Sequence, residues 1–181
     1  MFIEKTKLEG VLIITPQVFG DSRGWFFESY SKIKLEKLGL ICDFVQDNHS
    51  KSEHIHTLRG LHFQKNPKAQ AKLIRCVRGK IFDVAVDIRK SSPNYLKWIG
   101  VELTEENKKQ LFIPKGFAHG FLTLEENCEV MYKTDEYYAP ECDSGIRWND
   151  PDIGVDWKVD SPVLSQKDLN SKFIKDLDIG F

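Results

Sequence analysis

Short runs in which apolar and polar positions alternate follow one another along most of the chain. In the clearest run, at 81–88, four apolar side chains alternate with Asp83, Ala85 and Asp87. Alternation with a period of two is typical of a β-strand. Similar apolar runs predict further strands at 10–15, 25–30, 43–48, 57–64, 71–77, 97–103, 109–114, 118–124 and 128–134. Turn signals separate them at short intervals, which favours an all-β sandwich or barrel.

Helical patterns are few. The segment 32–39, which ends at Gly39, predicts a short helix after the first strands, and 104–109 predicts a turn. The segment 165–173 predicts a helical C-terminal tail. No linker, repeat or low-complexity tract interrupts the pattern, so we expect a single β-domain over residues 1–181.

Composition excludes several classes of protein. The chain has 181 residues, enough for one sizeable core, and 26 basic against 27 acidic residues. A net charge of -1 gives no basic footprint for nucleic acid. No apolar run approaches the roughly 20 residues that span a membrane, and the N-terminus lacks the apolar segment of a secretory signal. The four cysteines form no C-x-x-C pair, so we expect a reducing, cytoplasmic location.

The stretch TLRGLHFQ, 57–64, carries two polar residues on a strand-like run. Strict alternation puts Arg59 and His62 on opposite faces, so both reach one ligand only if the chain is re-aimed between them. Gly60 is placed to do this, because a glycine inside a strand often marks a bulge or a close backbone approach. The alternative is a solvated arginine and a lone histidine on a half-buried strand.

Three further polar residues, Lys72, His119 and Tyr132, fall on predicted inner faces of strands. Each alone has a structural explanation: an edge lysine, a satisfied core histidine and a tyrosine whose hydroxyl reaches the rim. Their coincidence favours one cavity, since a barrel gathers inward positions. A base, a cation and an acid in one cavity suit proton abstraction next to a carbonyl.

Histidines also bind metals, and PKGFAH at 114–119 resembles the second motif of the cupin superfamily. The first cupin motif normally supplies H-x-H and a glutamate. Here it has only His62, with Gln64 in the place of the second histidine and no glutamate. A catalytic divalent site usually needs three protein ligands, so the sequence predicts a metal-free site. The separate pair His54 and His56 is interpreted as polarity of a loop or of a strand edge.

Seven ordered blocks carry a closer resemblance. They are FGDSRGWFFES, FVQDNHS, LRGLHFQ, QAKLIRCVRGKIFDVAVDIRKSSPNY, FIPKGFAHGF, GIRWNDPDIGVDW and LSQKD. Together they resemble the dTDP-4-dehydrorhamnose 3,5-epimerase family over roughly residues 5–170. The resemblance implies a cupin-type double-stranded β-helix, or jelly-roll barrel, without metal or cofactor. It implies epimerisation at C3 and C5 of a dTDP-4-keto-6-deoxyhexose.

The resemblance also assigns catalytic roles. His62 becomes the base that removes both protons, with Asp168 as its carboxylate partner. Lys72 matches the lysine near the developing C4 oxyanion, and Tyr132 matches the acid that reprotonates from the opposite face. Ser165-x-x-Asp168 is also the spacing of a helix capping box. Asp168 is therefore either the partner of His62 or part of a helix cap.

Binding roles and an assembly follow from the same resemblance. Arg59 would grip the diphosphate, and Phe26 and Tyr138 would stack on thymine. Further binding positions are Arg23, Glu28, Gln46, Asp47, Asn48, His119, Asp143 and Lys167, with Asp143 standing where many relatives have Glu. The family forms two-fold homodimers that exchange N-terminal strands. We therefore expect the apolar strand 10–15 to be an edge that pairs with another chain, and Arg23 or Phe26 to reach the partner's pocket.

Two alternatives stay open. One is an epimerase of another nucleotide-linked 4-keto sugar, or one that acts at C3 or C5 only. The other is a sugar-nucleotide-binding cupin without catalysis. A binding module does not need a base, a cation and an acid arranged for proton transfer, so His62, Lys72 and Tyr132 favour an enzyme.

Overall fold

The computed structural model describes residues 1–181, and strands make up most of its regular structure. The strands are β1 (Phe2–Lys5), β2 (Leu12–Thr15), β3 (Val18–Asp21), β4 (Gly24–Phe27), β5 (Gln46–Ser52), β6 (Leu58–Gln64), β7 (Lys72–Arg78), β8 (Lys80–Asp87), β9 (Trp98–Thr104), β10 (Gln110–Ile113), β11 (Phe117–Thr123), β12 (Cys128–Thr134) and β13 (Asp143–Gly145). The helical pieces are α1 (Lys32–Lys37), α2 (Gln166–Leu169) and the 3₁₀ turn Ile174–Asp176. The prediction of an all-β fold with a short helix after the first strands is confirmed.

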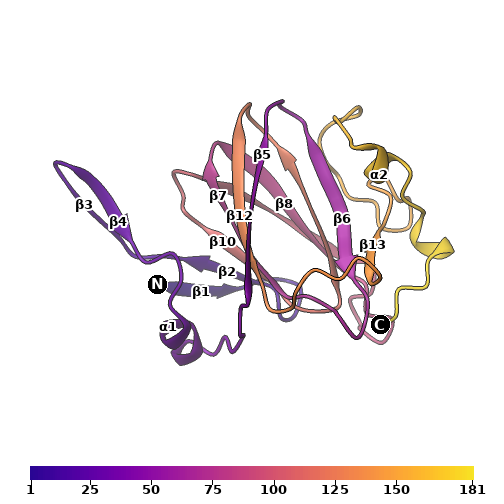
Figure 1. Ribbon diagram of the computed structural model, residues 1–181, viewed down its shortest axis with the longest axis horizontal. Coiled ribbons are helices and arrows are strands. Elements are labelled where there is room, and N and C mark those ends of the chain that lie inside the picture. The colour runs from indigo at the N-terminus through magenta and orange to yellow at the C-terminus, as the bar shows by residue number, and fades with distance from the viewer.

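Two antiparallel sheets face each other (Figure 1). One has the order β1-β2-β10-β7-β12-β5, and the other has the order β13-β6-β11-β8-β9. Strands that follow one another in the sequence, such as β6, β7 and β8, lie in alternate sheets, as a jelly roll requires. A third, two-stranded sheet joins only β3 and β4.

Apolar side chains from both sheets meet between them. Ile74 and Val130 come from the first sheet, and Ile81, Ala85 and Phe121 come from the second. Each large side chain buried here stabilises the fold by about 1.5–3 kcal/mol. The polar residues at neighbouring inward positions line a cavity between the same sheets.

The outer face of the second sheet is covered by the C-terminal segment, drawn in yellow beside β6 in Figure 1. Val84 and Val86 pack there against Ile146 and Trp157. As a result β8 is buried on both faces, and its acidic positions point between the sheets. The same packing lays α2 against β6.

The prediction of a helical tail over 165–173 is wrong for most of that segment. Only Gln166–Leu169 is α-helical, and a single 3₁₀ turn follows at Ile174–Asp176. Ile174 and Ile179 are buried on the sheet, so the tail spreads its apolar residues along the sheet and does not collect them on one helical stripe. A helix of this length has little stability of its own in water, and packing decides its extent.

The prediction that strand 10–15 is an unpaired edge is also wrong within the chain. β2 pairs with β1 on one side and with β10 on the other. The segment that stands apart is the hairpin β3–β4, which projects away from both sheets (Figure 1). Its aromatic side chains Phe19, Trp25 and Phe26 are 56%, 63% and 65% exposed.

None of the helices has the length and apolar character needed to cross a lipid bilayer. All four cysteines are free thiols. Cys76 and Cys128 are buried in the core between the sheets, where a free thiol packs as a small hydrophobic side chain.

Candidate active site

A bulge in β6 aims two polar side chains into one cavity. His62 pairs with His119 of β11, but Arg59 pairs with Phe121, so three steps along β6 match two along β11. The extra residue is accommodated at Gly60, whose φ is +125°. A Cβ at Gly60 would lie 2.6 Å from the Cα of Gly120, so only glycine fits. The predicted re-aiming of the strand is therefore confirmed.

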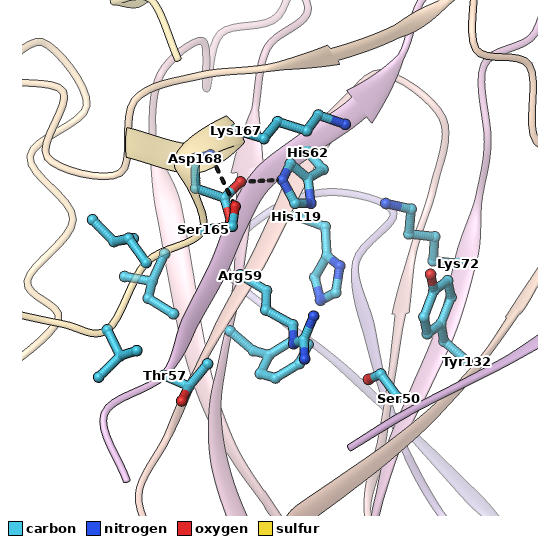
Figure 2. A pocket seen from close by; sticks show the side chains of 14 residues that line it. Ser50, Thr57, Arg59, His62, Lys72, His119, Tyr132, Ser165, Lys167 and Asp168 are labelled. Carbon is cyan, nitrogen blue, oxygen red and sulfur yellow. Dashed lines mark hydrogen bonds and ion pairs between the residues drawn. The ribbon is translucent and has the colours of Figure 1, made fainter. Parts of the chain in front are cut away.

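The cavity has a volume of about 480 Å³ and lies between the two sheets and α2. Figure 2 shows His62, Lys167 and Asp168 on one side, and Lys72 and Tyr132 on the opposite side. His119 and Arg59 lie between these two walls. The three polar residues predicted to share one cavity do so.

His62 is held by a buried carboxylate. Its Nε2 lies 2.5 Å from Oδ1 of Asp168, whose side chain is only 4% exposed. Burial alone would raise the pKa of Asp168, but the hydrogen bonds from His62 and Ser165 outweigh it and hold that pKa below its ordinary value. Asp168 is therefore ionised at neutral pH, fixes the imidazole and stabilises its protonated form. Nδ1 of His62 makes no hydrogen bond within the protein and faces the cavity.

Asp168 also belongs to the cap of α2. The Ser165 Oγ accepts a hydrogen bond from the Asp168 backbone N–H and donates one to Asp168 Oδ2. The reciprocal half of a capping box, from the Ser165 N–H to the Asp168 side chain, is not formed. Asp168 thus keeps Oδ1 for His62, and the two alternatives for this residue coexist.

Replacing Asp168 by asparagine should lower kcat by about 10- to 100-fold. A hydrogen bond to a charged group contributes about 1.5–3 kcal/mol, and each 1.4 kcal/mol corresponds to a tenfold change in rate. Ser165→Ala is the matched control, because it weakens the cap by about 1 kcal/mol but leaves the bond to His62. Steady-state kinetics and thermal melts of both variants separate the two effects. Equal losses of kcat in both variants would show that Asp168 acts only as a cap.

Lys72 and Tyr132 form the opposite wall. Burial of its ammonium group lowers the pKa of Lys72 to about 8, so the charged form still predominates at pH 7. Burial also raises the pKa of Tyr132, partly offset by the Arg59 guanidinium, so the phenol keeps its proton. This wall therefore presents a cation and a neutral proton donor.

Arg59 and His119 are oriented by other protein groups. The Arg59 guanidinium donates to Ser52 Oγ at 3.1 Å and to the Lys51 carbonyl at 2.9 Å. The His119 Nε2 lies 2.7 Å from Oδ1 of Asp83. Asp83 was not among the predicted site residues, although an acidic residue in the alternating run 81–88 was the available signal.

A second cavity, of about 200 Å³, adjoins the first and shares His62, Lys72, Tyr132 and Lys167 with it. It brings in four more predicted binding residues, Gln46, Asn48, Tyr138 and Asp143. Lys167 forms an ion pair with Asp143, which raises the pKa of Lys167. The Tyr138 hydroxyl donates to Asp143 Oδ2 at 3.3 Å, so Asp143 has contacts despite its short side chain.

Four predicted binding residues do not reach either cavity within this chain. Asp47 lies on the other face of β5 and forms an ion pair with Lys133 at 2.8 Å. Arg23 and Phe26 lie on the projecting hairpin, and Glu28 forms an ion pair with Lys34.

Some residues of the first cavity were not expected from the sequence. They are Ser50, Thr57, Leu58, Phe121, Val163, Leu164 and Ser165. Val163 and Leu164 reach the cavity only because the C-terminal segment packs beside β6. No local sequence pattern predicts this packing. No group of three or more His, Cys, Asp or Glu side chains is arranged to hold a metal ion.

Comparisons with known proteins agree on one family. The family model described as dTDP-4-dehydrorhamnose 3,5-epimerase matches residues 5–176. The chain is 52% identical over 179 residues to the dTDP-4-dehydrorhamnose 3,5-epimerase of Shigella flexneri, covering 98% of each chain. A Bacillus anthracis dTDP-4-dehydrorhamnose 3,5-epimerase, solved with TDP and PPi bound, superposes with a TM-score of 0.94 at 50% identity, covering 96% of this chain and 99% of the other. A Legionella pneumophila 3,5-epimerase, solved with dTDP-4-keto-L-rhamnose, superposes with a TM-score of 0.93 at 44% identity, covering 98% of this chain and 94% of the other.

Proposed function

This chain belongs to the dTDP-4-dehydrorhamnose 3,5-epimerase family, and from that premise we propose that it converts dTDP-4-dehydro-6-deoxy-D-glucose into dTDP-4-dehydro-L-rhamnose. One observation carries the proposal. An imidazole backed by a carboxylate faces an ammonium group and a phenol across a single cavity. The Legionella pneumophila relative is solved with dTDP-4-keto-L-rhamnose, which is the product of this reaction.

The proposed reaction begins with proton abstraction by His62. Its Nδ1 takes the proton from C3, which is acidic because C3 adjoins the C4 ketone. The electrons of the broken C–H bond move to the C4 oxygen, which becomes an enolate oxyanion. The Lys72 ammonium stabilises that charge, and preorganised charge at such a site is usually the largest contribution to rate.

Inversion then requires a proton from the other side. Tyr132 lies on the opposite wall from His62 and donates its hydroxyl proton to the far face of C3. His62 releases its proton to solvent and Tyr132 regains one, so no proton is gained or lost overall. The same cycle at C5, also next to the C4 ketone, completes the reaction.

The two adjoining cavities fit a nucleotide sugar. Volumes of about 480 and 200 Å³ together lie within the usual range of ligand sites. In this proposal Arg59 binds the diphosphate through its planar fork, and His119 contacts the sugar. Gln46, Asn48, Tyr138, Asp143 and Lys167 bind the nucleotide.

Metal independence is a further prediction. His62 and His119 are the only histidines in the cavity, and no group of three or more His, Cys, Asp or Glu side chains is arranged there to hold a metal ion, whereas a catalytic divalent site usually needs three protein ligands. We therefore expect full activity after dialysis against a chelator, measured as product formed per minute. Loss of activity that one divalent ion restores would contradict the proposed acid–base mechanism.

We also propose that the protein acts as a two-fold homodimer in which the N-terminal segment reaches across to the partner. The hairpin β3–β4 extends away from its own cavity, and its aromatic side chains are exposed. Arg23 lies on that hairpin with its side chain 88% exposed, paired only with Asp21. Docking on a partner would bury these aromatic side chains and bring Arg23 and Phe26 to the cavity of the partner subunit.

Mixing two inactive variants tests the shared site. In a mixed dimer of His62→Ala and Arg23→Ala chains, one pocket carries both changes and the other carries neither. We expect the mixture to regain up to about a quarter of the wild-type activity after subunit exchange, because half of randomly re-formed dimers are mixed. If subunit exchange is verified and no activity is recovered, this arrangement is contradicted. A fully active monomer in sedimentation experiments would contradict it as well.

The free thiols of all four cysteines support a cytoplasmic location, which we propose for this enzyme. Activity should therefore be recovered in the cytosolic fraction of cells that express the chain. Recovery mainly in a secreted or membrane fraction would contradict it.

The product identifies the reaction most simply. Incubation with dTDP-4-dehydro-6-deoxy-D-glucose should give a sugar inverted at both C3 and C5, which proton NMR coupling constants report. Inversion at one carbon only would identify a mono-epimerase. Binding without any change in the sugar would identify a non-catalytic sugar-nucleotide-binding protein.

A further inference from the structure

Asp83 carries a buried charge that the proposed reaction does not use. It lies on β8 and is fully buried. Its Oδ1 contacts His119 at 2.7 Å, but Oδ2 is excluded from solvent and has no hydrogen-bond partner. A buried carboxylate is stable only when a cation or several hydrogen bonds compensate it. The Oδ2 atom of Asp83 has neither an ion-pair partner nor a hydrogen bond.

His119 does not supply the missing positive charge. Burial lowers the pKa of His119 below its ordinary value, although Asp83 opposes this shift. The imidazole is therefore neutral at pH 7, with Nε2–H donating to Asp83. Nδ1 then carries the lone pair, makes no hydrogen bond within the protein and faces the cavity. A neutral His119 offers the substrate an acceptor for a hydroxyl, and it leaves Asp83 uncompensated.

Lys72 is the cation that compensates the negative charge of Asp83. The titratable groups that surround it are Asp83 on β8, Asp143 on β13, Tyr132 on β12, His62 on β6, His119 on β11 and Lys167 on α2. Of the two carboxylates, Asp143 raises the pKa of Lys72 more than Asp83 does, but Asp143 is already paired with Lys167. Lys72 itself forms no ion pair at contact distance, and Asp83 is the carboxylate with a free oxygen.

We propose that Asp83 is a positioning residue with two effects on the cavity. Through Oδ1 it fixes His119 so that Nδ1 faces the substrate. Through the charge on Oδ2 it keeps Lys72 in the ammonium form that stabilises the oxyanion. The inference rests on the proposed function, because it takes Lys72 to be the oxyanion-binding cation. Asp83 acts through His119 and Lys72 and does not touch the substrate.

Asp83→Asn tests the proposal, since it keeps the shape of the side chain and removes its charge. In the wild type kcat should fall at high pH as Lys72 deprotonates near its pKa of about 8. The negative charge of Asp83 raises the pKa of Lys72, so its removal should shift this alkaline limb by about one pH unit toward lower pH. The matched control is Asp87→Asn. Asp87 is equally buried on the same strand but is bonded to Arg89 and Ser92, outside the cavity.

The alkaline limb of the pH profile of Asp87→Asn should stay at the wild-type position, even if this variant is less stable than the wild type. In a Lys72→Arg background, where the guanidinium stays charged, Asp83→Asn should leave the pH profile unshifted. If Asp83→Asn lowers kcat by the same factor at every pH, with the limb unmoved, the electrostatic role of Asp83 is overturned.

A second measurement uses the wild-type protein alone. The imidazole ¹⁵N resonances of His119 should show a protonated Nε2 and an unprotonated Nδ1 at pH 7, because burial lowers the pKa of His119 and Asp83 Oδ1 accepts from Nε2. The opposite tautomer, or a doubly protonated ring, would overturn the proposal even if no variant folds. If the wild type fails to change the sugar nucleotide, the proposed function is wrong, and this measurement still decides whether Asp83 fixes the imidazole of His119.

Discussion

Replacing His62 by alanine should lower kcat by about 10²- to 10⁴-fold, the range typical of general acid–base groups, and should stop proton exchange at both carbons. Abstraction precedes every other step, so no second group can compensate for the missing base. Lys72 and Tyr132 stay in place on the opposite wall, so binding of the nucleotide sugar should change little.

The measurement is steady-state kinetics together with deuterium uptake from solvent. His49→Ala is the matched control, because His49 lies on β5, outside both cavities, and contacts Glu129. A loss smaller than about tenfold for His62→Ala would count against its role as the base.

Tyr132→Phe should fail in a different way, losing inversion while proton exchange persists. The base and the ammonium group remain, so the enolate still forms. Without the phenol, the proton returns from the His62 side and the original configuration is restored. Mass spectrometry should therefore find deuterium in the sugar, and proton NMR coupling constants should show that the configuration at C5 is unchanged.

Tyr137→Phe controls for the loss of a hydroxyl, since Tyr137 is 60% exposed and lines neither cavity. If Tyr132→Phe and His62→Ala both invert C5 at the normal rate, the acid–base assignment is wrong.

The strands that could be predicted are those with a buried face. Alternation gave β6 to β12 within a few residues, because most of their inward positions are apolar. It placed β5 at 43–48, too early, because the apolar Phe44 and Val45 precede this strand and its own seven residues are all polar. It missed β1, in which three of four residues are exposed, β3, in which all four are exposed, and β13, which has only three residues. None of these has the contrast between faces on which the period-two signal depends.

The site was predictable to a similar extent. Inward polar residues on strands indicated the cavity, and Gly60 indicated the bulge. The contact between His62 and Asp168 spans 106 residues and depends on how the C-terminal segment packs, so it required the family resemblance. Asp83 was overlooked because β8 is buried on both faces, and the alternating pattern did not show that its acidic face points between the sheets.

The most direct test of the account is solvent exchange during turnover in deuterated water. Both protons that the proposed mechanism removes are replaced from solvent, so the product should carry deuterium at C3 and at C5. ¹H NMR should show both signals lost, at rates that match product formation. Deuterium at neither carbon in a product that is nonetheless inverted would contradict the proton-transfer mechanism.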